Sequence, residues 1–342
     1  MATILLPVGI VGSVGLLFGI GLGIASKKLY VHVDPRINQI NEALPQANCG
    51  ACGYPGCSGF AKAVAEGKAD PSGCIPGGAK VANQVAEIVG ATAADSQPMV
   101  AVVHCKGGAK EAGERAAYQG IKDCRAAVLS GNGSKVCQDG CLGLGSCEAV
   151  CPFDAIKVND NNVAVVDPGK CTGCGKCIEA CPRNIIELAP KIHKIFLGCN
   201  NHERGAKVKK YCSVGCTACS LCVKATPSGA ITMENFLPKL DYTKDENFVP
   251  AAHKCPQNCF VDLVRVRPKV NIDTKCDGCT DCVEVCPTKA ISGDPGERHV
   301  VDKEKCIGCG ICLSHCHAHA IQLWGGLGYS KHDNIRRHRA NS

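Results

Sequence analysis

One short phrase, centred on a Cys-Pro dipeptide, recurs along this chain and limits how the chain can fold. Its six copies are CPFDAI at 151, CPRNII at 181, TPSGAI at 226, CPQNCF at 255, CPTKAI at 286 and CHAHAI at 316. The copies fall in pairs about 30 residues apart, a period typical of repeated supersecondary units. We therefore predict three modules, each built from two half-motifs.

Cysteine is unusually abundant in this sequence. The chain has 342 residues with 29 cysteines and only 4% aromatic residues, so a large aromatic core is not expected. Most of the cysteines stand two residues apart in tight runs, which suits ligation of one metal centre better than disulfide pairing with distant partners. The formal charge of +7 counts every thiol as neutral, and thiolates around bound clusters would reverse much of it. We therefore expect metal clusters and no nucleic-acid partner.

The last module follows the rule of two-cluster bacterial ferredoxins. In C-x2-C-x2-C-x3-C-P, three cysteines wrap one [4Fe-4S] cluster and the last cysteine crosses to the other cluster. The rule predicts one site at Cys276, Cys279, Cys282 and Cys316, and a second at Cys306, Cys309, Cys312 and Cys286. His317 replaces the usual proline. Zinc knuckles, the alternative, use pairs of cysteines and not triplets.

The first module is regular only in its second half. There the rule predicts a site at Cys171, Cys174, Cys177 and Cys151. In the first half Leu144 occupies the middle ligand position, and another cysteine lies a few residues upstream. We predict a widened loop with a site at Cys137, Cys141, Cys147 and Cys181.

The middle module carries Thr226 in place of a cysteine. The positions where its second loop would offer thiolates hold Asp245, Phe248 and Ala251. The threonine and the missing triplet therefore represent one lost cluster, and the module keeps a single predicted site at Cys216, Cys219, Cys222 and Cys255. Cys212 is an open alternative to Cys219. The cysteines left unassigned, read as buried thiols or as parts of an extra site, are Cys105, Cys124, Cys199, Cys212 and Cys259.

A different cysteine pattern precedes these modules. The segment NCGACGYPGCSGFAKAVAEGKADPSGC predicts a site at Cys49, Cys52, Cys57 and Cys74, with small and turn-forming residues between the ligands. Short helices are expected after Cys57 and after Cys74. A structural zinc site is the alternative here, because this spacing is less specific than the Cys-Pro runs. In total we predict six [4Fe-4S] clusters.

The N-terminal segment is long and apolar. Residues 4–25 carry no charge, which is enough for a transmembrane helix, and Lys27 and Lys28 follow directly. The positive-inside rule then predicts a single span in the cell membrane, with the bulk of the chain on the cytoplasmic side. A cleaved signal peptide is the alternative, but no basic residues precede the apolar run.

These features predict an α+β chain of consecutive small domains. Residues 91–104 pass from a polar linker into an apolar run that is expected to form a strand, and similar runs at 193–199 and 261–272 precede the second and third modules. The predicted divisions are a transmembrane helix (1–26), an N-terminal 4Fe-4S domain (27–90), a connecting segment (91–134), a two-cluster module (135–190), a degenerate one-cluster module (191–268), a two-cluster module (269–323) and a basic tail (324–342).

The N-terminal span, the Cys49 to Cys74 pattern, CLGLGSC and CPFDAI together resemble the B subunit of the Rnf complex, an ion-translocating ferredoxin:NAD+ oxidoreductase, in its long polyferredoxin form. The resemblance implies a translocase subunit that takes electrons from reduced ferredoxin and passes them to flavin-bearing membrane subunits. The chain has no dinucleotide fingerprint or P-loop, so no NAD or flavin site and no catalytic residue is predicted in it. The alternatives are a membrane polyferredoxin serving a hydrogenase-type enzyme and a structural zinc protein.

Overall fold

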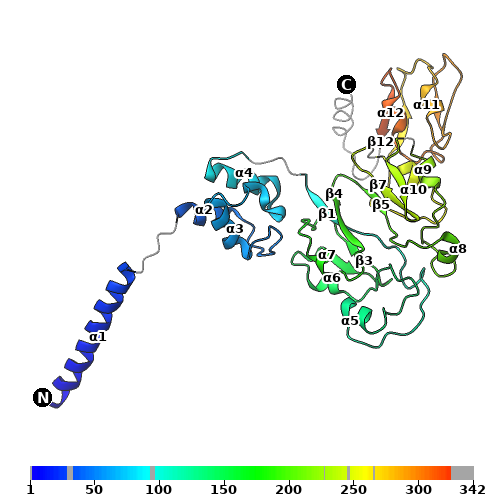
Figure 1. Cartoon of the computed structure of the whole chain (residues 1–342). Helices are drawn as coiled ribbons and strands as arrows, with labels where there is room; N and C mark the ends of the chain where they lie inside the picture. Colours follow the sequence, from blue (N-terminus) through cyan, green and yellow to red (C-terminus); the bar gives the residue numbers. More distant parts are fainter. Residues whose placement is uncertain are drawn as a thin grey trace. The chain divides into compact units, whose positions relative to one another are not determined.

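The structure is a computed structural model that describes residues 2–28, 34–92, 97–226, 228–244, 247–264 and 266–324. The side chains of residues 2–11 and 324 are outside this set, as are Asp245, Pro227 and the predicted basic tail beyond residue 324. The chain divides into two compact units, 1–95 and 96–342 (Figure 1).

The first unit opens with helix α1, Ala2–Lys28, which ends on Lys27 and Lys28. The predicted N-terminal helix is therefore present as a helix. None of the helices within the described residues is long and apolar enough to qualify as a bilayer span.

Three further helices of the first unit pack around the predicted Cys49 to Cys74 segment. They are α2 (Pro35–Ala43), α3 (Gly56–Ala65) and α4 (Gly78–Val89), with 3-10 turns at Pro71–Gly73 and Ile75–Gly77. Asp34 caps α2 by accepting from the Arg36 backbone, and Gly90 ends α4 in the left-handed conformation. The side chains of Ile40, Phe60 and Val85 form the apolar core. Helices α3 and α4 confirm the two predicted after Cys57 and Cys74.

The second unit repeats one arrangement of antiparallel strands three times. In each repeat a leading strand pairs with the closing strand, and a hairpin lies between them in the sequence. The outer pairs are β1 (Met99–Val103) with β4 (Ile186–Pro190), β5 (Ile195–Leu197) with β8 (Phe260–Asp262), and β9 (Lys269–Ile272) with β12 (Ile321–Trp324). The hairpins are β2 (Ile156–Val158) with β3 (Ala164–Val166), β6 (Ile231–Glu234) with β7 (Leu237–Leu240), and β10 (Ile291–Ser292) with β11 (Val300–Val301).

The helices of the second unit are only one or two turns long. They are α5 (Cys124–Leu129), α6 (Ser146–Ala149), α7 (Lys176–Ala180), α8 (Gly205–Val208), α9 (Leu221–Lys224), α10 (Val249–Lys254), α11 (Asp281–Glu284) and α12 (Ile311–Ser314). Helices this short are not stable alone in water. The cores of the three modules mix apolar side chains with cysteines.

The sequence repeat is also a repeat of backbone conformation. The third residue after each of the six anchors has a positive φ, and these residues are Asp154, Asn184, Gly229, Asn258, Lys289 and His319. Asparagine, aspartate and glycine tolerate this left-handed region best, which fits four of the six positions. The copy that begins at Thr226 keeps the turn, so the loss of its cysteine left the local fold in place.

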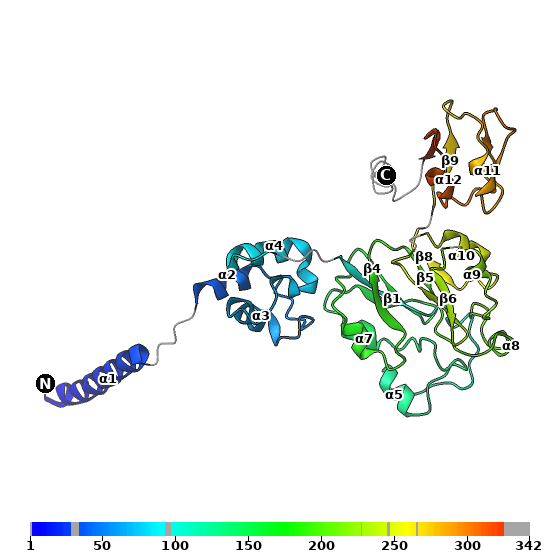
Figure 2. The same cartoon turned by 45° about the horizontal axis from the view of Figure 1, so that its top comes forward.

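One predicted division differs from the strand pairing. The segment 91–134, expected to connect two domains, contains β1, and β1 pairs with β4 over its whole length from Met99↔Pro190 to Val103↔Ile186. The two strands run side by side in both views (Figures 1 and 2). The first module therefore begins at its leading strand, as the other two do.

Candidate metal centres

The structure brings the cysteines of the chain together mainly in fours. Six groups contain the cysteines expected from the sequence, except that Cys124 stands in one group in place of Cys137. They are group 1 (Cys49, Cys52, Cys57, Cys74), group 2 (Cys124, Cys141, Cys147, Cys181), group 3 (Cys151, Cys171, Cys174, Cys177), group 4 (Cys216, Cys219, Cys222, Cys255), group 5 (Cys276, Cys279, Cys282, Cys316) and group 6 (Cys286, Cys306, Cys309, Cys312).

Groups 5 and 6 have the crossed arrangement. Burial, and then the neighbouring thiols of Cys279, Cys276 and Cys316, raise the pKa of Cys282 to about 11. In group 6, burial and the thiols of Cys309, Cys306 and Cys286 raise the pKa of Cys312 to about 12. Each triplet is thus approached by the cysteine that follows the other triplet. Since ligation requires thiolates, metal must displace these protons when it binds.

Group 3 repeats the crossed arrangement in the first module. Burial and the thiols of Cys171, Cys174 and Cys151 raise the pKa of Cys177 to about 12. The backbone N–H of Ala155 donates to Cys151 Sγ at 3.3 Å. Equivalent N–H groups, four residues after the cysteine, donate to Cys255 at 3.3 Å and to Cys286 at 3.2 Å. Such N–H···S bonds favour the charged thiolate.

Group 2 contains Cys124 where the sequence predicted Cys137. Burial and the thiols of Cys141, Cys124 and Cys181 raise the pKa of Cys147 to about 12. Cys124 is held there by the start of α5, because its backbone N–H donates to Ser146 Oγ at 2.6 Å. Ser146 Oγ in turn donates to Asp123 Oδ2 at 2.8 Å, and Asp123 caps α5. Helix α5 therefore delivers the thiol that Leu144 does not supply.

Cys137 lies in a different place. It lines a cavity together with Cys105, Cys199 and Cys212, four thiols that belong to none of the six groups. We call this space the Cys137 cavity. Cys212, the open alternative to Cys219, therefore lies away from group 4, whereas Cys219 is next to Cys222.

Group 4 is the single group of the middle module. Burial and the thiols of Cys216, Cys255 and Cys219 raise the pKa of Cys222 to about 11. The neighbouring Cys259 thiol lowers the pKa of Cys255, which favours its thiolate form. The pKa of Cys259 is raised for the same reason, because its thiol lies beside the thiols of Cys216 and Cys255.

Apolar packing fills the space where the middle module would need a second set of ligands. Thr226 is 4% exposed and donates its hydroxyl to the carbonyl of Cys222 at 3.1 Å. Phe248 and Ala251 are 1% and 0% exposed in the core of the module. The described part of this region thus offers a packed core and no second triplet.

A Thr226→Cys variant is accordingly expected to bind no additional cluster. The new thiol would lie near the carbonyl of Cys222, and the described part of this region holds no three further thiolates for it to join. Iron and acid-labile sulfide per chain should equal those of the unaltered protein. A gain of about four irons would contradict the pairing scheme.

Group 1 is built around the turn between α2 and α3. Burial is the main cause that raises the pKa of Cys74, followed by the thiols of Cys57, Cys52 and Cys49. Asn48 Oδ1 accepts from the backbone N–H of Cys57 at 2.9 Å and orders the loop. A Cβ at Gly56, which has φ +81°, would lie 2.9 Å from Asn48 Oδ1, so glycine is required there.

The ligand loops of the second unit share a backbone pattern. The residue two positions before the third cysteine is left-handed in every loop, at Gly145, Gly175, Ser220, Thr280 and Gly310. Alternating left- and right-handed residues turn successive N–H groups to one side and create an anion-binding concavity. A metal cluster bound to thiolates presents such a negative surface. The loops therefore fit an iron–sulfur cluster chemically.

Two histidines lie beside group 5. His299 is buried and its Nδ1 is 3.3 Å from Cys276 Sγ. His317, which replaces the usual proline, is exposed and contacts Asp277 Oδ2 through Nε2 at 2.7 Å. Asp277, Cys279 and His317 are close enough together to share a small cation. Because Cys279 also belongs to group 5, we assign the histidine and aspartate to the surroundings of that group.

Comparisons with known proteins agree with this chemistry. Residues 44–76 match the family described as "Putative Fe-S cluster", residues 164–187 match "4Fe-4S binding domain", and residues 275–321 match "4Fe-4S dicluster domain". With its repeated ferredoxin-like modules, the chain is thus an iron–sulfur protein of the polyferredoxin class.

Relatives define the family more narrowly. The chain is 44% identical to the B subunit of the Na(+)-translocating ferredoxin:NAD(+) oxidoreductase complex of Acetobacterium woodii, over 75% of this chain and 77% of that protein. It is 39% identical to the B subunit of the proton-translocating complex of Clostridium ljungdahlii (77% and 94%) and 32% identical to that of the ion-translocating oxidoreductase complex of Methanosarcina acetivorans (85% and 99%). The chain belongs to the family of B subunits of the ion-translocating ferredoxin:NAD+ oxidoreductase, or Rnf, complex, which confirms the resemblance.

Proposed function

We propose that this chain is the electron-relaying subunit of an ion-translocating ferredoxin:NAD+ oxidoreductase. In this role it accepts electrons from reduced ferredoxin and conducts them through about six [4Fe-4S] clusters to flavin-bearing membrane subunits. The observation that carries the proposal is the assembly of groups 1 to 6, each with four thiols, within one member of the family. Cys124 takes the place of Cys137 in group 2.

The residues of the chain would hold and tune the bound groups. When bound, a [4Fe-4S] cluster supplies a one-electron centre whose charge is spread over a rigid cube. The thiolates of each group fix its position, and backbone N–H groups such as those of Ala155 and Ala290 stabilise negative charge on sulfur. Burial of the thiols excludes water, which favours the less charged state. Cys219 is exposed, so group 4 is open to solvent on one side.

Reduction by ferredoxin tests the proposed function. The full chain, purified without oxygen, is expected to be brown and to lose visible absorption when reduced ferredoxin is added. Dithionite serves as the chemical control. Bleaching by dithionite but not by ferredoxin would contradict the proposed donor, and a colourless protein containing zinc would contradict the iron–sulfur assignment.

We also propose that helix α1 anchors the chain to the cell membrane as a single pass, with the remaining residues on the cytoplasmic side. The support is its apolar side chains, of which Leu16, Leu17 and Phe18 are more than 60% exposed and have no protein partner that would bury them within the described residues. Lys27 and Lys28 at its end fit the positive-inside rule.

A charge in the helix tests the anchor. Arginine in the middle of a span costs about 3 kcal/mol, so the Leu17→Arg/Phe18→Arg variant is expected to leave washed membranes for the soluble fraction. A Leu17→Ile/Phe18→Leu variant is the matched control and should stay with the membrane. Equal retention of both variants would contradict anchoring by α1.

A further inference from the structure

The Cys137 cavity is a second kind of four-cysteine site, and it lies where the first two modules of the second unit meet. Its walls include Cys105 and Cys137 from the first module and Cys199 and Cys212 from the middle module. The cavity has a volume of about 20 Å³, similar to the space of about 10 Å³ that the thiols of group 4 line.

The four cysteines are two pairs related by the internal repeat. Cys105 follows β1 and Cys199 follows β5, each two residues after the strand ends. Cys137 in KVCQDGC is four residues before Cys141 of group 2, and Cys212 in KYCSVGC is four residues before Cys216 of group 4. The bridge Ala112↔Cys212 and the hydrogen bond from Lys106 N to Gly198 O join the two modules beside the cavity. Two equivalent loops thus face each other and offer two thiols each.

The backbone comes close to the sulfurs of the cavity at two glycines. A Cβ at Gly140 would lie 3.3 Å from Cys137 Sγ and 3.7 Å from Cys105 Sγ, and a Cβ at Gly107 would lie 3.1 Å from Cys212 Sγ. These contacts are tighter than, or close to, van der Waals distance. Glycine at these positions therefore keeps side-chain atoms away from the thiols.

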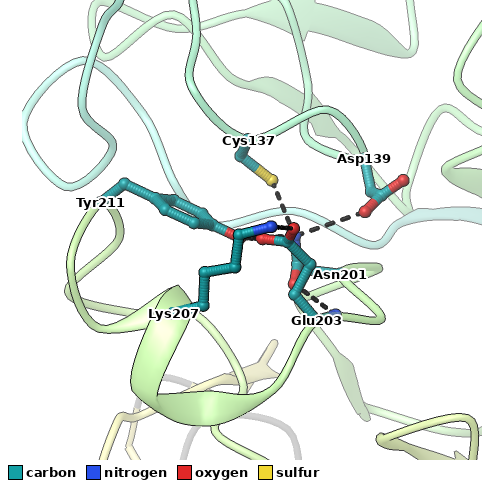
Figure 3. Close-up of polar contacts among 6 residues, drawn as sticks. All are labelled: Cys137, Asp139, Asn201, Glu203, Lys207 and Tyr211. Atoms are coloured by element: carbon teal, nitrogen blue, oxygen red, sulfur yellow. Dashed lines mark hydrogen bonds and ion pairs between the residues drawn. The ribbon is translucent and has the colours of Figure 1, made fainter.

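Several donors already point at the sulfurs of the cavity. Asn201, which is 3% exposed, donates its side-chain amide to Cys137 Sγ at 3.4 Å (Figure 3). The same amide contacts Asp139 Oδ2 at 3.3 Å and Tyr211 OH at 2.9 Å, which fixes its orientation. The backbone N–H groups of Val214 and Gly215 face Cys212. Donors directed at sulfur stabilise thiolates and metal-bound thiolates.

A buried lysine lies beside the thiols of the Cys137 cavity. Lys135 is 2% exposed, and its ammonium donates to the carbonyl of Gly107 at 2.7 Å. Its charge acts on the thiols of Cys105 and Cys212 as well as on Cys141 of group 2. A fully buried lysine is costly without negative partners, and thiolates around a bound cluster would provide them.

Amide groups of neighbouring ligands connect the cavity to groups 2 and 4. The backbone N–H of Cys216, a group 4 residue, donates to Cys199 Sγ at 3.3 Å. The backbone N–H of Cys141, a group 2 residue, faces Cys105 Sγ. One thiol of the cavity is therefore in contact with a loop of group 4, and another with a loop of group 2.

We propose that Cys105, Cys137, Cys199 and Cys212 bind a seventh [4Fe-4S] cluster that links the first module to the middle module. The inference rests on the proposed iron–sulfur function and extends it. The lost cluster of the middle module is thereby replaced by a centre at the junction, and Cys259 is the one cysteine of the sequence that remains outside all seven sets.

Metal analysis of the full chain tests this site. The unaltered protein, purified without oxygen, is expected to contain about 28 irons and as many sulfides, and the Cys105→Ser/Cys212→Ser variant about four fewer of each. The variant should also accept one electron fewer in a dithionite titration. Ser213→Ala, an exposed change next to Cys212, is the matched control and should keep all the iron.

The outcomes distinguish failure of the seventh cluster from failure of the proposed iron–sulfur function. Equal iron in the variant and the unaltered chain would show four free thiols and overturn the seventh cluster, while the six-cluster relay stands. Loss of one zinc and no sulfide would identify a zinc site and also overturn it. An unaltered protein without iron or sulfide would instead overturn the proposed function itself. Retained electron paramagnetic resonance signals of groups 5 and 6 in the variant exclude misfolding.

Discussion

Replacing Cys316 by alanine is expected to empty group 5 and to leave group 6 loaded, although Cys316 follows Cys312 of group 6 closely in the sequence. The thiol of Cys316 lies beside Cys282, whereas Cys312 is beside Cys286. Each single variant, Cys316→Ala or Cys282→Ala, should lose about four irons per chain.

Pairs of substitutions distinguish the crossed arrangement from an uncrossed one. Effects on one shared site do not add, whereas effects on two independent sites do. The Cys282→Ala/Cys316→Ala variant should lose about four irons in total, and the Cys312→Ala/Cys316→Ala variant about eight. Iron and sulfide analysis measures both. The reverse order, with eight irons lost from the first pair, would contradict the exchange of ligands between loops.

Removal of the metal is expected to unfold the second unit. Its helices span four to six residues, and the strand pair β10–β11 joins only two residues on each side. Cysteines form much of each core, and burial keeps thiols such as Cys312 protonated when no metal is bound. Without the clusters each module is a small core that cannot offset its chain entropy.

Hydrogen exchange measures this loss. Backbone amides of buried strand residues, for example Val102, Ile156 and Val270, are expected to be protected in the loaded protein and to exchange freely after treatment with ferricyanide and a chelator. Resupply of iron and sulfide under reducing conditions is the control and should restore protection. Undiminished protection in the stripped chain would mean that hydrophobic packing alone holds the modules.

The crossed triplets could be predicted from sequence because ligand spacing and cluster geometry constrain each other. A loop with two-residue gaps can wrap three corners of a cluster, and the cysteine before proline is then carried toward the neighbouring site. The groupings around Cys177, Cys282 and Cys312 follow this rule in the structure. Helices α3 and α4 were predictable from their apolar periodicity.

The fourth member of group 2 was not predictable from spacing. Leu144 signals that a ligand is missing, and Cys137 is the nearer substitute in the sequence. Cys124 is in place instead because Ser146 and Asp123, which are remote from each other along the chain, are joined by a hydrogen bond. This hydrogen bond is visible only in the structure and not in the sequence.

Strand partners also required the structure. The apolar runs that form β1, β5 and β9 were recognisable, but short strands with similar composition fit several partners equally well. The pairing of each leading strand with the strand after the last anchor closes each module, as Val103↔Ile186 and Ile272↔Ile321 illustrate. This closure places Cys105 and Cys199 at the junction where the Cys137 cavity forms.

Iron and acid-labile sulfide per chain, counted together in the full protein purified without oxygen, test the central claim most directly. Groups 1 to 6 predict about 24 of each, and the Cys137 cavity raises the expected number to about 28. A reductive titration followed by electron paramagnetic resonance should then show one electron taken up for every four irons. A protein that carries zinc and no sulfide, or only a few irons, would contradict the relay.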